Sequence, residues 1–256
     1  LRINPDIDAK SHPHISTGLK INKFGIPLDD AREVVGTITG RSSITLVAIH
    51  VHLGSQMTTT GPVERAAILV AKLVAEFKAR GIELEYLDLG GGLGISYDGR
   101  DVASADEYAS ALLPAVRPTG LPLVIEPGRS IVGPAGALIA RVIDIKPRTA
   151  DSDFAVLDAG MTELMRPALY NAYHRIDPIR PSGRSLKQYE FCGPVCESSD
   201  VVGRDRIVPA LEVGDLVAIA DAGAYGSAMA SNYNRRPLPP EVLVDDGSWR
   251  VIRRRQ

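Results

Sequence analysis

Residues 43–55 read SITLVAIHVHLGS, a β-branched and apolar run that ends in a polar turn containing glycine. Residues 62–80 follow as PVERAAILVAKLVAEFKAR, with apolar side chains at helical spacing, Pro62 suited to a first turn and Gly81 suited to a stop. Residues 83–89, ELEYLDL, return to a short strand. A strand, a helix and a strand in this order need a crossover connection, so we predict a parallel sheet.

The same alternation continues toward the C-terminus. Ser104-x-x-Glu107 has the form of a capping box, which predicts a helix running toward Val116. Residues 121–125 are the next apolar run and predict another strand. We therefore predict an α/β domain over residues 1–135.

Residues 136–256 have a different texture, with short strand-like runs separated by turn residues. The runs that predict strands are residues 137–145, 154–157, 216–220, 242–244 and 249–252. Asp246-Gly247 separates the last two runs, which indicates a tight hairpin. We predict a C-terminal antiparallel β-barrel or β-sandwich domain.

Composition excludes several classes of protein. The 256 residues are 45% hydrophobic and 23% charged, which is typical of a soluble globular protein. The net charge of -2 supplies no positive field for nucleic acid. No apolar run reaches the length of a membrane span and no signal peptide is evident, so we expect a cytoplasmic protein. Cys192 and Cys196 lack a neighbouring His for a metal site, and we expect free thiols.

Three polar or glycine-rich clusters directly follow predicted strands: residues 52–55, 90–92 and 126–129. Loops at the C-terminal ends of strands in a parallel barrel share one face, so we expect these clusters to converge. Backbone N–H groups of a glycine triplet can approach an anion closely, and Arg129 and Ser55 add donors suited to a phosphate. Each cluster alone would be an ordinary turn, with Arg129 a surface ion-pair partner.

Other phosphate and sugar chemistries fit less well. Gly90-Gly-Gly-Leu-Gly94 has neither the P-loop pattern nor the helix that follows a dinucleotide-binding turn. Glu126 and Asp88 could be proposed as the carboxylate pair of a glycosidase. However, Asp88 lies inside a predicted strand, where a structural hydrogen bond is the favoured role. A small phosphorylated cofactor remains the best interpretation.

Six segments, in order along nearly the whole chain, resemble the diaminopimelate decarboxylases. They are His50-Val-His52-Leu-Gly-Ser55, Asp88-Leu-Gly-Gly-Gly92, Glu126-Pro-Gly-Arg129, Met165-Arg-Pro-Ala-Leu-Tyr170, Cys192-Gly-Pro-Val-Cys196-Glu197 and Asp221-Ala-Gly-Ala-Tyr225. The similarity extends from Ile15-Ser-Thr-Gly18 to Glu241-Val-Leu243. This family belongs with ornithine decarboxylase and alanine racemase among the fold-type III enzymes that use pyridoxal 5′-phosphate (PLP).

The resemblance implies a fold and an assembly. It implies a (β/α)8 TIM-like barrel over residues 1–135, incomplete here because its first strands would precede Leu1, and a C-terminal β domain over residues 136–256. It also implies a homodimer in which Cys196 and Glu197 cross the two-fold interface.

The resemblance also assigns cofactor contacts. His52 would stack on the pyridine ring. The phosphate would be surrounded by Ser55, Gly90, Gly91, Gly92 and Tyr225, and the cofactor set also includes Gly128 and Arg129. Glu126 would face the pyridine nitrogen. A carboxylate there keeps the nitrogen protonated, so the ring can accept the electron pair of the broken carbon–carboxylate bond. Alanine racemases place an arginine at this position, so Glu126 favours decarboxylation.

Substrate contacts follow from the same resemblance. Arg129, Arg166 and Tyr170 would bind the distal carboxylate, Glu197 would bind the distal amino group, and Tyr225 would complete the substrate set. Two guanidinium groups suit a substrate with a distal acid better than a simple diamine. The catalytic set is His52, Glu126 and Cys196, with Cys196 the expected proton donor to the carbanion.

The remaining histidines and the lysines have no expected catalytic role. We expect His50, separated from His52 by Val51, to point to the opposite face of a regular strand and to be structural. His12, His14 and His174 have no partner pattern, so a satisfied or exposed histidine is expected at each. None of the seven lysines follows a barrel strand. We therefore expect the Schiff-base lysine upstream of Leu1, and this chain alone to be inactive.

The expected reaction is the decarboxylation of meso-2,6-diaminopimelate to L-lysine and CO2, the last step of lysine biosynthesis. One alternative is a decarboxylase of a related amino acid such as carboxynorspermidine. Another is a non-catalytic PLP-binding relative.

Overall fold

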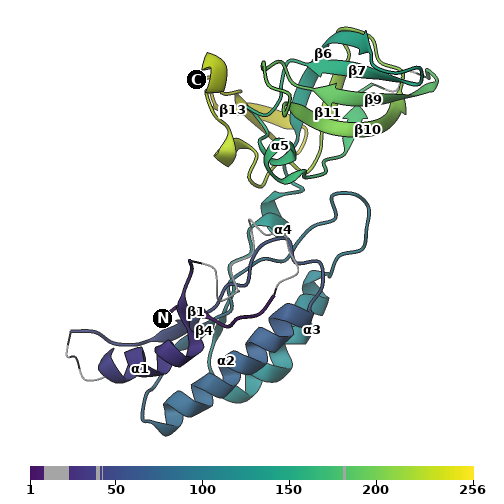
Figure 1. Ribbon diagram of the computed structural model, residues 1–256. Coiled ribbons are helices and arrows are strands. Elements are labelled where there is room, and N and C mark those ends of the chain that lie inside the picture. Colours follow the sequence, from purple (N-terminus) through teal and green to yellow (C-terminus); the bar gives the residue numbers. More distant parts are fainter. Residues whose placement is uncertain (9–22, 39–40, 42, 181–182) are drawn as a thin grey trace. The chain divides into compact units, whose positions relative to one another are not determined.

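The chain forms two compact units, residues 1–131 and residues 132–256, each with its own hydrophobic core. The computed structural model describes residues 1–8, 23–38, 41, 43–180 and 183–256 (Figure 1).

Unit 1 contains a row of short parallel strands. They are β1 (Ile3–Asn4), β2 (Ile26–Pro27), β3 (Ala48–His50), β4 (Tyr86–Asp88) and β5 (Leu123–Val124). The pairs β1–β2, β3–β4 and β4–β5 are all parallel, and an Arg2–His50 bridge sets β1 beside β3. The parallel sheet expected from the sequence is confirmed, although its strands are shorter than predicted.

The helices of unit 1 follow their sequence signals closely. Helix α2 spans Gly61–Ala79 and buries the stripe that includes Val63, Val70 and Phe77. Helix α3 spans Ala105–Val116, and its capping box forms between Ser104 and Glu107 as expected. The helices α2 and α3 contact each other (Figure 1) and bury their apolar faces in the same core as β3 and β4.

Three further helical segments were not expected from the sequence. Helix α1 spans Leu28–Ile38, the 3-10 helix η1 spans Arg117–Thr119, and helix α4 spans Arg129–Val132. The α1 helix buries only Ala31 and Val35, so its apolar stripe is too thin to stand out in the sequence.

Unit 2 is built mainly of strands. They are β6 (Leu138–Pro147), β7 (Ser152–Leu157), β8 (Ile176–Pro178), β9 (Leu186–Cys192), β10 (Val201–Pro209), β11 (Leu216–Ile219), β12 (Glu241–Asp245) and β13 (Ser248–Arg253). Six of them form one sheet in the order β10-β9-β7-β6-β11-β8. Strand β10 also contacts β8, where Gly203 packs against Ile176, so the sheet curls on itself.

The expectation of a purely antiparallel sheet in unit 2 is wrong at one pair, because β7 and β9 run parallel. The long connection between them carries helix α5 (Arg166–Tyr170) and β8, which gives the chain room for the crossover that parallel strands need. The hairpin of β12 and β13 is confirmed, and Asp246 and Gly247 both have positive φ in its turn. Two 3-10 helices, η2 (Ser227–Met229) and η3 (Tyr233–Arg235), precede this hairpin.

No helix among the described residues is both long enough and apolar enough to cross a membrane.

Candidate active site

The three clusters predicted to converge do meet in unit 1. A Cβ on Gly91 would collide with the backbone carbonyl of Glu126, and a Cβ on Gly92 would collide with that of Gly54. The Glu126 N–H donates to the carbonyl of Gly90 at 2.8 Å. The glycine triplet therefore lies directly between the other two clusters, and only a residue without a side chain fits there.

The amides of the triplet also have specific partners. The Gly91 N–H donates to His52 Nδ1 at 3.2 Å, and the Gly90 N–H donates to Asp88 Oδ1 at 2.9 Å. The second contact is the hydrogen-bonding role expected for Asp88. The first leaves the proton of a neutral His52 on Nε2.

His52 lies just past the end of β3 and is half-buried. Burial lowers the pKa of His52 below its ordinary value of 6.5, and the nearby charge of Arg2 lowers it further. The ring is therefore neutral near pH 7. A neutral imidazole can lie against a protonated pyridine without charge repulsion.

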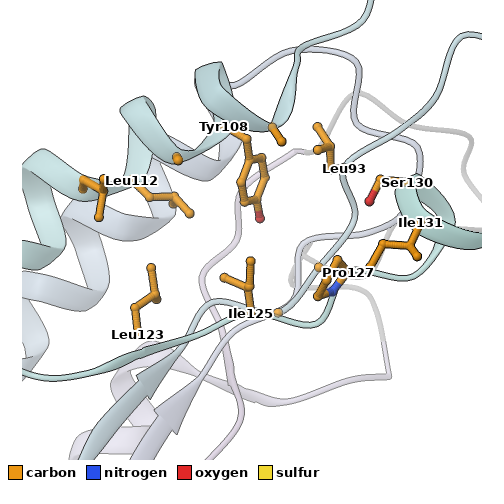
Figure 2. A pocket seen from close by; sticks show the side chains of 13 residues that line it. Leu93, Tyr108, Leu112, Leu123, Ile125, Pro127, Ser130 and Ile131 are labelled. Carbon is orange, nitrogen blue, oxygen red and sulfur yellow. The ribbon is translucent and has the colours of Figure 1, made fainter.

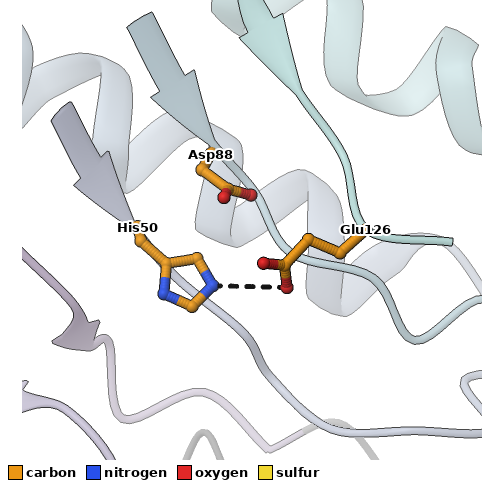
Figure 3. Close-up of side chains that lie close together, drawn as sticks. All are labelled: His50, Asp88 and Glu126. Carbon is orange, nitrogen blue, oxygen red and sulfur yellow. Dashed lines mark ion pairs between the residues drawn. The ribbon is translucent and has the colours of Figure 1, made fainter.

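The expectation that His50 points away from this site is wrong. His50 Nε2 lies 3.6 Å from Glu126 Oε2, and Figure 3 shows the His50 ring directed at Glu126 with Asp88 beside them. Residues two apart on a strand point to the same face, so His50 and His52 share a side. This periodicity was the signal that could have identified His50. The three side chains come from the ends of β3 and β4 and from just after β5.

His50, Asp88 and Glu126 offer ligand atoms that all lie within 4.8 Å of one another, a spacing that would also suit a metal ion. Glu126 keeps 52% of its side chain exposed, so its carboxylate is accessible from the strand ends. The carboxylates of Asp88 and Glu126 also lie close enough to His52 to act on its charge.

Arg129 begins helix α4 and is buried. Its Nε and Nη2 donate to Ser55 Oγ at 3.2 and 3.1 Å, and its Nη1 donates to Tyr97 Oη at 2.7 Å. Arg129 and Ser55 thus form one polar corner beside the triplet. Tyr97 has no motif in the sequence that would have marked it.

Next to the triplet lies an apolar cavity of about 360 Å³, bordered by Gly90 and Gly91. Figure 2 shows Tyr108 of α3 extending into it, opposite Ile125 and Pro127. Burial raises the pKa of Tyr108 to about 12, so its hydroxyl keeps its proton.

Among the candidate residues of unit 2, Arg166 is buried at the start of α5. Its Nη1 lies 2.7 Å from Nε2 of His174, which is fully buried, as expected of a satisfied histidine. Tyr170 ends α5 and is half-buried. Tyr225 has a positive φ of 58° and is 46% exposed.

Cys196 and Glu197 are exposed on a loop that Asp200 organises. Asp200 is buried, and its carboxylate accepts the N–H groups of Met161 at 2.6 Å and Val195 at 2.8 Å. No sequence motif around Asp200 predicted that it would hold this loop.

Both cysteines are free, as predicted. Burial raises the pKa of the Cys192 thiol to about 11, which keeps it protonated and unreactive. Cys196, by contrast, is on the surface of unit 2.

In unit 1, the described lysines are Lys23, which is exposed and lies three residues before β2, and Lys72 and Lys78 on α2. In unit 2, Lys146 is on β6 and Lys187 pairs with Asp153. None of these described lysines directly follows a strand of unit 1. His12, His14, Lys10, Lys20 and Ile15–Gly18 lie outside the described residues.

Comparison with known proteins gives one consistent result. The family described as "Pyridoxal-dependent decarboxylase, pyridoxal binding domain" matches residues 1–133. Diaminopimelate decarboxylase of Neisseria meningitidis serogroup A is 47% identical over the whole chain, which covers 63% of that protein.

Solved structures agree. The crystal structure of Helicobacter pylori diaminopimelate decarboxylase complexed with L-lysine matches with a TM-score of 0.95 at 44% identity, over all of this chain and 63% of that one. The enzyme of M. jannaschii in complex with L-lysine matches with a TM-score of 0.92 at 40% identity, over all of this chain and 60% of that one. The chain therefore spans about three fifths of the length of these relatives.

Proposed function

Because this chain belongs to the pyridoxal-dependent decarboxylase family, we propose that the complete protein decarboxylates meso-2,6-diaminopimelate to L-lysine and CO2. The observation that carries the proposal is the meeting of Gly91, His52 and Glu126 at the strand ends of unit 1. It is supported by relatives named diaminopimelate decarboxylase at 42–47% identity over the whole chain.

The residues at this meeting point fit PLP. The glycine triplet leaves no room for a side chain at its backbone. Around it lie the neutral imidazole of His52, the accessible carboxylate of Glu126, and Arg129 paired with the Ser55 hydroxyl. The Gly90 and Gly91 amides already have acceptors, so Arg129 and Ser55 are the stronger candidates for the phosphate. The wider set in this proposal also includes Gly92, Gly128 and Tyr225.

Bound PLP supplies an electron sink for the pair left when the carbon–carboxylate bond breaks. The residues of this chain set the conditions for that chemistry. Glu126 would hold a proton at the pyridine nitrogen, and His50 faces the Glu126 carboxylate, with Nε2 3.6 Å from Oε2. His52 would lie against the pyridine ring, and its imidazole is neutral because burial lowers its pKa.

Substrate selection is assigned to a second set of side chains. Arg129, Arg166 and Tyr170 bind the distal carboxylate, Glu197 binds the distal amine, and Tyr225 lines the same substrate. Cys196 delivers the proton that replaces the lost carboxylate. Cys196 is exposed on its own unit, which agrees with a role reached from a partner subunit.

We extend the proposal to architecture and setting. Residues 1–135 form the PLP-binding part of a (β/α)8 barrel and residues 136–256 form a C-terminal β domain. The complete protein is a cytoplasmic homodimer that acts in the last step of lysine biosynthesis.

The test uses the complete protein loaded with PLP and assays L-lysine and CO2 from meso-diaminopimelate. Glu126→Gln should keep PLP, seen by its visible absorbance, and lower kcat on the order of 100-fold, because a neutral amide no longer holds the pyridine proton. Glu85→Gln makes the same change at an exposed residue just before β4 and should leave kcat unchanged.

Three outcomes would contradict the proposal. Undiminished turnover by Glu126→Gln would remove its role. Turnover of carboxynorspermidine in place of diaminopimelate would replace the substrate. PLP binding with no turnover of any amino acid would make the protein a non-catalytic relative.

A further inference from the structure

His174 is completely buried and joins two segments of unit 2 that the proposed function uses. Its Nε2 lies 2.7 Å from Arg166 Nη1, and its Nδ1 lies 2.8 Å from the carbonyl oxygen of Ala220. Arg166 opens helix α5, and Ala220 precedes the turn that leads to Tyr225.

The chemistry of the two partners fixes the protonation of His174. A guanidinium has only donors, so Nε2 must accept from Arg166. A carbonyl has only lone pairs, so Nδ1 must carry the proton and donate to Ala220. Both contacts independently require the neutral ring with its proton on Nδ1.

The local fold explains why His174 lies between these segments. Asn171 takes a left-handed conformation that ends α5 and turns the chain back past Arg166. The next strand, β8, pairs with β11, and the ladder continues to the Ala220 N–H, which donates to the carbonyl of Arg175 at 2.9 Å. The ring of His174 is thereby fixed beside the end of β11.

We propose that His174 is a positioning residue that orients the Arg166 guanidinium for the distal carboxylate of the substrate. The proposal rests on the proposed function, in which Arg166 binds that carboxylate. A guanidinium recognises a carboxylate through a planar, directional fork, so an acceptor that fixes one of its nitrogens presets the plane of the fork. Presetting it lowers the ordering cost of binding a ligand with that carboxylate.

Ligands of matched shape separate this role from general packing. Decarboxylation removes one of the two amino-acid carboxylates of diaminopimelate, so L-lysine retains the distal carboxylate. Cadaverine has the same carbon chain without any carboxylate. Orientation of Arg166 should therefore matter for diaminopimelate and L-lysine and should not matter for cadaverine.

Two variants of His174 divide its two hydrogen bonds. His174→Asn keeps an amide N–H near Nδ1 for Ala220 and loses the acceptor for Arg166. His174→Gln extends an amide oxygen toward the position of Nε2 and keeps that acceptor. Both are measured in the complete PLP-loaded enzyme, with circular dichroism, Tm and PLP content to monitor folding.

We expect His174→Asn to raise the KM for diaminopimelate and the inhibition constant of L-lysine roughly tenfold, the size of one charge-assisted hydrogen bond. The kcat and the inhibition constant of cadaverine should change less than about twofold, and His174→Gln should recover most of the L-lysine affinity. In an Arg166→Met background, His174→Asn should have no further effect on L-lysine, because its partner is already gone.

Contrary results separate the two ideas. If Arg166→Met loses L-lysine affinity while His174→Asn retains it, the positioning role is wrong and the proposed function stands. If His174→Asn weakens L-lysine and cadaverine equally, or His174→Gln fails to recover while it folds normally, the residue is only structural. If the wild-type enzyme neither turns over diaminopimelate nor binds L-lysine, the proposed function fails and the positioning role fails with it.

Discussion

The two units hold their candidate site residues by different means. In unit 1, the glycine triplet packs against the backbones of residues 52–55 and residues 126–129, so the geometry depends on main-chain contact. In unit 2, the candidate residues lie on loops and a short helix, and buried polar side chains hold them there. Asp200 fixes the loop of Cys196, and His174 fixes Arg166.

This difference predicts which kind of substitution destabilises each unit. Backbone packing tolerates no added atom, because the chain itself would have to move. A buried polar side chain tolerates a change of shape better than a change of hydrogen-bonding pattern. We therefore expect an added methyl group to destabilise unit 1 most, and the exchange of a hydrogen-bond acceptor for a donor to destabilise unit 2 most.

The largest expected effect comes from Gly91→Ala. The new methyl group would collide with the Glu126 carbonyl, which is backbone and cannot rotate away. We expect the free energy of unfolding of unit 1 to fall by about 3 kcal/mol. Urea unfolding followed by circular dichroism measures it.

Gly128→Ala is the matched control, because Gly128 lies two residues after Glu126 and a Cβ there meets no atom within 4 Å. It should change the free energy of unfolding by less than about 0.5 kcal/mol. Equal stability of the two variants would show that main-chain contact does not hold this site.

Sequence patterns predicted the elements with strong local signals. The apolar stripe and Pro62 of α2, the Ser104 capping box of α3 and the Asp246-Gly247 hairpin all form as expected. Helix α1 was missed because it buries only Ala31 and Val35. Strand β8 was missed because it is short and pairs with β11, which is distant in the chain. Strands β9 and β10 pair with each other through irregular register, which interrupts the alternation that a local pattern would show. The parallel pairing of β7 with β9 likewise depends on a crossover that no local pattern reports.

The candidate site divides in the same way. Convergence of the three clusters followed from parallel strands alone, and it is confirmed for unit 1. His50 was misjudged by an error of strand periodicity. The partners of Arg166 and the role of Asp200 could not be predicted, since they depend on tertiary hydrogen bonds between side chains and backbone. The roles assigned to individual site residues stay predictions.

Asp200→Asn should have an intermediate effect in unit 2. Its carboxylate accepts two backbone N–H groups, and an amide would turn one acceptor into a donor facing a donor. We expect a loss of about 2 kcal/mol in the free energy of unfolding, measured by urea titration.

The control is Asp151→Asn, because Asp151 is exposed. It removes the same charge and should leave stability nearly unchanged. If both variants lose equal stability, the charge matters and the hydrogen-bonding pattern does not. That outcome would remove the contrast between the units.

The smallest expected effect is a pH dependence of opposite sign in the two units. Burial lowers the pKa of His52. Below about pH 6.5 the unfolded chain therefore binds a proton more readily than the folded chain does. Stability falls as the pH falls toward the lowered pKa. Burial raises the pKa of Asp200, so its contribution instead falls as the pH rises from 3.8 through the raised value.

His52→Gln tests the first half of this contrast. The variant should flatten the dependence of unit 1 stability on pH below about pH 6.5 and should run parallel to the wild type well above that value. Urea unfolding at a series of pH values, read from the slope of stability against pH, measures the difference. An unchanged slope below about pH 6.5 would mean that His52 binds its proton equally well in the folded and unfolded states. That result would contradict the claim that burial keeps the His52 ring neutral.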